Sequence, residues 1–340
     1  MTMRRTELDL CRLTGCGMVL FIHTSAALYH ICPLDASAFI PLSLISTMMR
    51  GGVPVFFMLT GALFLNRETL ALRRFLKTHV LRLILLFAFW SLVYALGARL
   101  AARDFGDWYS FFFDLAKGHY HLWFLTAMAL GCLFLPVAHA AIHKGQLKGE
   151  YLLFLFFGVS ILCANCNLTP DTALILNRIT LDFSLDYLPY LGYAVWGWWL
   201  SRQHFGRQWL LIAPAGFLLC TALTTWGNIW YSNYKEVADG WLFSYFSLST
   251  LTQATMCFCF FQALKDRPFR RPRLWAALAD CTLGVYLLHP LFINILEALG
   301  LPMTLEAPVL SILCFTAVLA AVCFAAVALG RMIRVILKLI

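Results

Sequence analysis

The chain has 340 residues, of which 61% are hydrophobic and only 13% carry a charge. Because a soluble domain carries about 25% charged residues, this composition excludes an ordinary water-soluble protein and predicts an integral membrane protein. The net charge of +9 could indicate a nucleic-acid partner, but the basic residues lie mostly in short segments between apolar runs. We therefore expect membrane lipids as neighbours and no nucleic acid.

Apolar runs long enough to cross a hydrocarbon core, which takes about 20 residues, recur along the whole chain. They must form helices, because backbone polar groups in lipid have to be paired and alternating strands of the porin type are absent. We predict an all-α polytopic membrane protein with about ten transmembrane helices and a single domain over residues 1–340. The predicted spans lie near residues 8–31, 38–65, 75–98, 121–142, 149–166, 184–201, 208–227, 241–264, 274–297 and 307–330.

The basic residues orient these spans. With the N-terminus inside, the cytoplasmic segments hold 18 of the 26 Lys and Arg residues and the outer segments hold five. This asymmetry follows the positive-inside rule and predicts that both termini are cytoplasmic. The basic loop at 265–273 is interpreted as an orientation signal and a lipid contact. The first span has a basic start but no clear small-residue cleavage site, so we expect it to be retained.

Two ionisable residues lie within the first span. Arg12 and His23 are eleven residues apart, so at about 100° per residue they project from nearly one face, roughly 16 Å apart along the axis. An arginine near the cytoplasmic boundary can hold a phosphate or carboxylate, and a histidine beyond mid-membrane can act as a general base or relay. Alternatively, Arg12 reaches the headgroups, paired with Asp9, and His23 is a satisfied core histidine.

The second and ninth spans contain helix-breaking residues. The Gly51-Gly52 pair and Pro54 predict a broken helix that exposes backbone N–H groups, although close helix packing explains the glycines equally well. In the ninth span, His289 has a depth similar to that of the first-span histidine and is followed by Pro290, which can kink the helix. The alternative for this histidine is a packing role beside the kink.

The third and fourth spans add further candidates. Arg82 lies about two turns into the third span, at a depth close to that of the first-span arginine, so the two could converge on one polyanion. His121 and Trp123 open the fourth span at the outer surface, where a tryptophan is an expected interface anchor. The outer stretch at 99–120 is predicted to lie in the interface or to re-enter the membrane, and the stretch at 167–183 is a second place where an outer site could be lined.

The twelve cysteines are scattered, mostly within apolar runs. The one Cys-x-x-Cys pair, Cys163 and Cys166, has no second pair and no histidine at zinc spacing. We interpret the pair as core packing and expect no metal.

Five motifs are spread over spans one to nine. They are Arg12 with His23, VPVFFMLTG at 53–61, the basic start of the third span, HLWFL at 121–125 and GVYLLHP at 284–290. In this order they resemble the acyltransferase-3 superfamily of membrane O-acyltransferases. Two positions depart from the family pattern: Thr60 replaces the usual serine, and His79 replaces the first of two arginines found in many members.

The resemblance implies a ten-helix fold in a bacterial inner (cytoplasmic) membrane. It also implies acyl-CoA, in particular acetyl-CoA, as donor and a cell-surface or lipid-linked glycan as acceptor. His23 would be the catalytic base or acyl relay, with Arg12 required for transfer. The expected donor-binding residues are Arg12, Arg74, His79 and Arg82, and the expected acceptor-binding residues are His121, Trp123, Tyr286 and His289.

Two alternatives stay open at this stage. Direct transfer and an acyl-histidine intermediate fit the same residues. A transporter or flippase of glycan intermediates would also use intramembrane charges and a broken helix, although no inverted repeat is evident. The acceptor sugar, the hydroxyl position, the acyl chain and the oligomeric state are not specified by these motifs.

Overall fold

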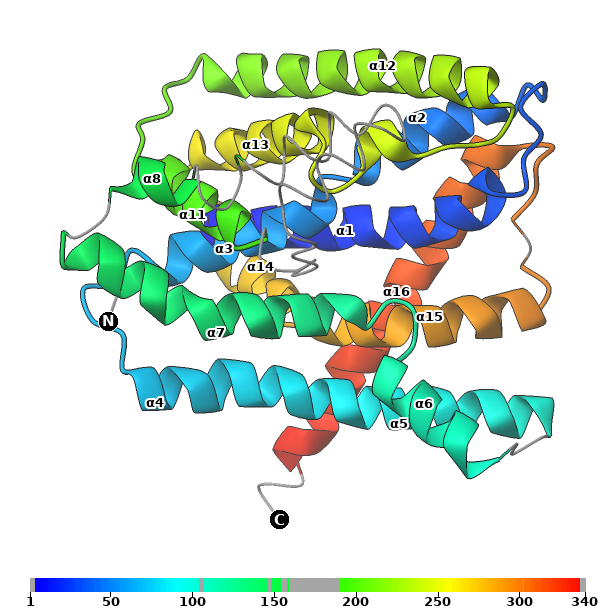
Figure 1. Cartoon of the computed structure of the whole chain (residues 1–340), viewed down its shortest axis with the longest axis horizontal. Coiled ribbons are helices and arrows are strands. Elements are labelled where there is room, and N and C mark those ends of the chain that lie inside the picture. Colours follow the sequence, from blue (N-terminus) through cyan, green and yellow to red (C-terminus); the bar gives the residue numbers. More distant parts are fainter. Residues whose placement is uncertain are drawn as a thin grey trace, which may run out of the picture.

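A computed structural model describes the chain at residues 4–103, 107–145, 148–153, 158, 190–301 and 303–336. All regular elements among these residues are helices. In Figure 1 most of them run roughly side by side, α1 (Thr6–Tyr29) lies in the middle of the bundle, and α16 (Pro308–Ile336) crosses the others obliquely.

Six stretches are long and apolar enough to cross a membrane. Four are single helices, one is a pair of helices that follow one another, and one contains a π-helical turn. They are α1; α2 (Phe39–Met49) with α3 (Gly52–Phe64); α4 (Leu72–Phe75) with η1 (Leu76–Val80) and α5 (Leu81–Ala102); α7 (Trp123–His143); α12 (Trp209–Lys235); and α16.

A seventh candidate span is bent. It consists of α14 (Pro272–Ala279) and α15 (Thr282–Ala298), which meet at 52°. The sequence suggested a kink at Pro290, but α15 continues through this proline. The bend lies at residues 280–281 instead, where Asp280 takes part in ion pairs with other elements.

The described residues account for six or seven spans, fewer than the ten expected. The predicted span at 149–166 falls largely outside the described residues, which include α8 (Gly149–Leu153). The predicted span at 184–201 is described from residue 190, as α11 (Tyr190–Ser201). The predicted span at 241–264 is a 3-10 turn, η3 (Trp241–Phe243), followed by α13 (Leu248–Gln262), which has 15 residues. Ten spans and two cytoplasmic termini therefore stay predictions.

The glycines of the second span serve both purposes that the sequence left open. Residues 50 and 51 form a turn between α2 and α3, as expected for a broken helix. A Cβ added to Gly52 would lie 2.7 Å from the Met18 Cβ, and one added to Gly61 would collide with the backbone of Ala194 on α11. Small residues thus allow α3 to pack closely against α1 and α11.

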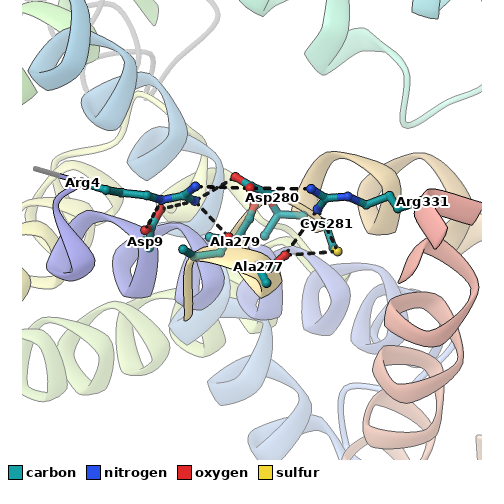
Figure 2. A network of polar contacts seen from close by, with 9 residues as sticks. Arg4, Asp9, Ala277, Ala279, Asp280, Cys281 and Arg331 are labelled. Atoms are coloured by element: carbon teal, nitrogen blue, oxygen red, sulfur yellow. Dashed lines mark hydrogen bonds and ion pairs between the residues drawn. The ribbon is translucent and has the colours of Figure 1, made fainter. Parts of the chain in front are cut away.

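Ion pairs fasten the start of α1 to α14 and α16. The Arg4 Nε atom lies 2.7 Å from Asp9 Oδ2, and Arg4 Nη2 lies 2.8 Å from Asp280 Oδ1 (Figure 2). Arg331 Nη2 approaches the other oxygen of Asp280 at 3.6 Å. Because Asp9 is occupied by Arg4, the pairing of Asp9 with Arg12 considered from the sequence does not form.

An amphipathic helix, α6 (Trp108–Lys117), folds back against the end of α5. Asp107 caps it by accepting a hydrogen bond from the Ser110 N–H at 2.6 Å. Trp108 and Tyr109 are 78% and 81% exposed. Exposed aromatic rings are what a helix in the membrane interface presents to lipid, in line with the location expected for 99–120.

Candidate active site

A cavity of about 390 Å³ lies between α1, α3, α5, α7 and the α14–α15 pair. This volume is within the range of small-molecule sites, about 300–1,000 Å³. Seven of the nine site residues expected from the sequence line it: Arg12, His23, His79, Arg82, His121, Trp123 and Tyr286. The two that do not are Arg74 and His289.

Arg12 and Arg82 supply positive charge to the cavity. Among the described residues, no carboxylate oxygen lies within 4 Å of either guanidinium group. Asp280 also lines the cavity, but Arg4 and Arg331 engage it. Arg12 is therefore a cation that the described part of the protein leaves available for an anionic ligand.

The π-helical turn η1 places His79 at the cavity. Its ring contacts Phe64, with centroids 4.7 Å apart, and Phe75, at 4.9 Å. A π-turn inserts extra backbone into the helix and so changes which side chains of the third span face the cavity, and such turns are frequent at functional sites. Arg74 is exposed on a separate surface hollow with Arg73 and Lys77.

Three histidine side chains lie close together on the His23 side of the cavity. The ring centroids of His23 and His289 are 4.7 Å apart, and those of His121 and His289 are 5.3 Å apart. His289 is fully buried directly behind the cavity wall. Its Nδ1 lies 2.6 Å from the Tyr286 carbonyl oxygen, which can only accept, so Nδ1 carries the proton. The Nε2 lone pair is then left without a partner and is available as a base or an acceptor.

Aromatic rings form one wall of the cavity. Trp123 lies 5.4 Å from Tyr245 and 5.8 Å from Tyr190 between ring centroids. The Tyr286 hydroxyl donates a hydrogen bond to the His121 carbonyl and so joins α15 to the start of α7. Rings that stand beside hydroxyl-binding groups are suited to a sugar, because they stack on its apolar face.

The chain matches a family model described as an acyltransferase domain over residues 5–329. It belongs to the acyltransferase-3 family. Comparisons with curated proteins and with solved structures found no significant match. The family makes the protein a multi-pass membrane acyltransferase, which requires an acyl donor and a hydroxyl-bearing acceptor.

The acyltransferase site includes residues to which the sequence assigned no role. Tyr245 lines the cavity from the loop before α13, where no pattern pointed to it. His119 lies beside His121, with their Nδ1 atoms 2.8 Å apart, and the His-Tyr-His spacing at 119–121 was the available signal. Arg50 does not line the cavity and lies in the turn at the α2–α3 break.

The described residues contain no group of three His, Cys, Asp or Glu side chains able to hold a metal ion. The Cys163 and Cys166 pair lies outside these residues.

Proposed function

We propose that this acyltransferase moves an acyl group, in the first instance acetyl, from cytoplasmic acyl-CoA to a hydroxyl group of a cell-surface or lipid-linked glycan. The observation that carries the proposal is one cavity lined by both Arg12 and His23. Acyl-CoA has an anionic head and a reactive thioester, so its transferase needs cations for the first and a base or nucleophile for the second.

The donor end of the cavity would be the one lined by Arg12, His79 and Arg82. Guanidinium groups bind phosphates with several N–H donors in a fixed fork, and those of Arg12 and Arg82 are free of carboxylates among the described residues. The exposed cluster at Arg73, Arg74 and Lys77 would attract the donor to the cytoplasmic mouth.

The transfer step would take place at His23. The imidazole accepts the proton of the acceptor hydroxyl while its oxygen attacks the thioester carbonyl carbon. The C–S bond then breaks, the ester forms, and the CoA thiolate takes the proton back from the imidazolium to leave as free thiol. In the alternative order, the acyl group first moves from sulfur to the His23 nitrogen and then to the hydroxyl.

His289 would support this step from behind. Its ring lies 4.7 Å from that of His23, so its Nε2, unpartnered among the described residues, is a hydrogen-bond acceptor behind the reacting imidazole. Trp123, Tyr286 and His121 would hold the acceptor on the same side of the cavity.

Binding of acetyl-CoA to the purified protein tests the donor assignment. Arg12→Ala and Arg82→Ala should each weaken binding by about 10-fold to 150-fold, the range for losing a hydrogen bond to a charged group. Arg202→Ala is a matched control, because this arginine lies over the Trp198 ring at 5.2 Å and away from the cavity. If neither Arg12→Ala nor Arg82→Ala changes the affinity for acetyl-CoA, the donor assignment is refuted.

Release of free CoA thiol separates an enzyme from a transporter. An acyltransferase of this kind releases the thiol at a rate that depends on both donor and acceptor. A transporter would move the glycan without consuming acyl-CoA, and that result would overturn the proposed function.

A further inference from the structure

A seam of buried polar side chains lies between α2, α12 and α13. On α12 they recur at intervals of four, three and four residues, which puts them on one helix face. The seam consists of Ser43 and Thr47 on α2, Thr221, Thr225, Asn228 and Ser232 on α12, and Gln253 on α13.

Some of these groups bond one another. The Asn228 amide donates to the Tyr29 hydroxyl at 3.0 Å, and the Gln253 amide donates to the Thr221 hydroxyl at 3.0 Å. Tyr29 in turn donates to the carbonyl of Asp239 at 3.2 Å, in the loop after α12. Bonds of this kind join helices in a membrane and need no ligand to explain them.

Other atoms of the seam have no partner among the described residues. They are Ser43 Oγ, Thr47 Oγ1, Thr225 Oγ1, Asn228 Oδ1 and Gln253 Oε1, and their side chains are buried. A buried polar group left unpaired costs about 1–3 kcal/mol, and lipid offers no replacement. Five such atoms on neighbouring helices are therefore open to hydrogen-bonding groups from outside the described part of the chain.

Arg50 lies at one end of the seam, in the turn between α2 and α3. Its Nε is buried without a partner, and no carboxylate oxygen of the described residues lies within 4 Å. Its guanidinium group lies over the Phe243 ring at 4.4 Å. A cation in the middle of a membrane-spanning stretch needs an anion or a polar cavity, and among the described residues no acid pairs with Arg50.

Arg50 is also close to the reacting end of the acyltransferase cavity. Its side chain reaches Tyr245, which lines that cavity, and its charge acts on the His23 imidazole. The adjacent Gly51 packs against the backbone at Gln253 and Ala254, with an added Cβ 3.2 Å from the Ala254 nitrogen. Seam and cavity thus meet at the α2–α3 break.

We propose that the seam receives the acceptor from the outer face and that Arg50 binds an anionic group on it, a carboxylate or a phosphate. The acceptor is then an acidic glycan whose hydroxyls pair with Thr47, Thr225, Asn228 and Gln253. Arg50 is a positioning residue in this arrangement: it fixes the acid group so that a neighbouring hydroxyl faces His23. This proposal rests on the proposed function for the identity of the acceptor as a glycan.

Binding of small glycosides tests the proposal without acyl transfer. Methyl β-D-glucuronide carries a carboxylate, glucose 6-phosphate carries a phosphate, and methyl β-D-glucoside carries neither. Their affinities for the protein in nanodiscs are compared by ligand-observed NMR, in wild type, Arg50→Gln, Arg50→Lys and the control Arg202→Gln. Thermal unfolding and acetyl-CoA binding are measured on the same samples.

The wild type should bind at least one acidic probe about 10-fold to 100-fold more tightly than the neutral glucoside. Arg50→Gln should lose this preference, Arg50→Lys should keep part of it, and Arg202→Gln should keep all of it. Thr47→Val, which removes a seam hydroxyl at constant shape, should weaken the acidic and neutral sugars alike. Preference for the glucuronide identifies a sugar acid, and preference for the sugar phosphate identifies a phosphorylated acceptor.

Equal binding of acidic and neutral probes by the wild type, or no binding of any probe, would overturn the proposal. A second result would also overturn it: Arg50→Gln unfolds at a lower temperature, whereas Arg50→Lys is as stable as the wild type but shows no preference for acidic probes. Arg50 would then be a structural cation. If the glycosides bind as expected but acetyl-CoA does not, the proposed function fails and the anion site stands.

Discussion

Replacing Arg4 and replacing Arg12 should have opposite consequences, although Arg4 lies just before α1 and Arg12 lies in its second turn. Arg4 is engaged on both sides, by Asp9 and by Asp280 (Figure 2), whereas no described carboxylate pairs with Arg12. Arg4→Gln should therefore lower stability and leave donor affinity unchanged. Arg12→Gln should weaken donor binding and leave stability unchanged.

The magnitudes follow from the contacts. Arg4 donates to both oxygens of Asp9, at 2.7 and 3.0 Å, and the Asp9 side chain is only 6% exposed, so the glutamine variant leaves a buried carboxylate without its cation. Breaking a fully buried pair costs about 3–5 kcal/mol. Because the Arg4 side chain is 47% exposed and screened by solvent, we expect a smaller loss, about 2 kcal/mol. Arg12→Gln removes no such pair.

A thiol-reactive dye provides the stability assay. Eight cysteines are buried in the described structure and become reactive only on unfolding. Arg4→Gln should lower the unfolding temperature by several degrees, and Arg12→Gln should not. In acetyl-CoA titrations the effects should reverse: Arg12→Gln should bind acetyl-CoA about 10-fold to 150-fold more weakly than the wild type, and Arg4→Gln should bind it with unchanged affinity. The reasoning is refuted if Arg12→Gln destabilises the protein as much as Arg4→Gln does, because Arg12 would then have a structural partner.

Three further predictions concern the site. His23→Ala should retain acetyl-CoA binding and lower the transfer rate by about 10²-fold to 10⁴-fold, measured as CoA thiol release, and a wild-type rate would remove His23 from the mechanism. Tyr286→Phe breaks the bond to the His121 carbonyl and should raise the acceptor KM with little change in the donor KM, and an effect on the donor alone would contradict this. Gly61→Val forces a side chain into the Ala194 backbone and should lower the unfolding temperature, whereas an unchanged temperature would show that α3 and α11 pack less closely.

Local sequence was sufficient for most of the helices. The apolar runs that became α1, α7, α12 and α16 are continuous, so length and hydropathy identify them without knowledge of their neighbours. The Gly51-Gly52 pair likewise marked the α2–α3 break, because glycine weakens a helix wherever it stands. The π-turn at 76–80 and the bend at 280–281 were not visible, since no local residue pattern requires them.

The sequence by itself placed Arg12 and His23 on one face of one helix, because helical periodicity fixes the relation between residues on the same element. It also supplied the motifs of the family to which the chain belongs. It did not place His289 behind His23, Tyr245 in the cavity wall, or Arg50 at the end of the seam. These relations join residues far apart in the chain, and only the packing of α2, α12, α13 and α15 around α1 brings them together.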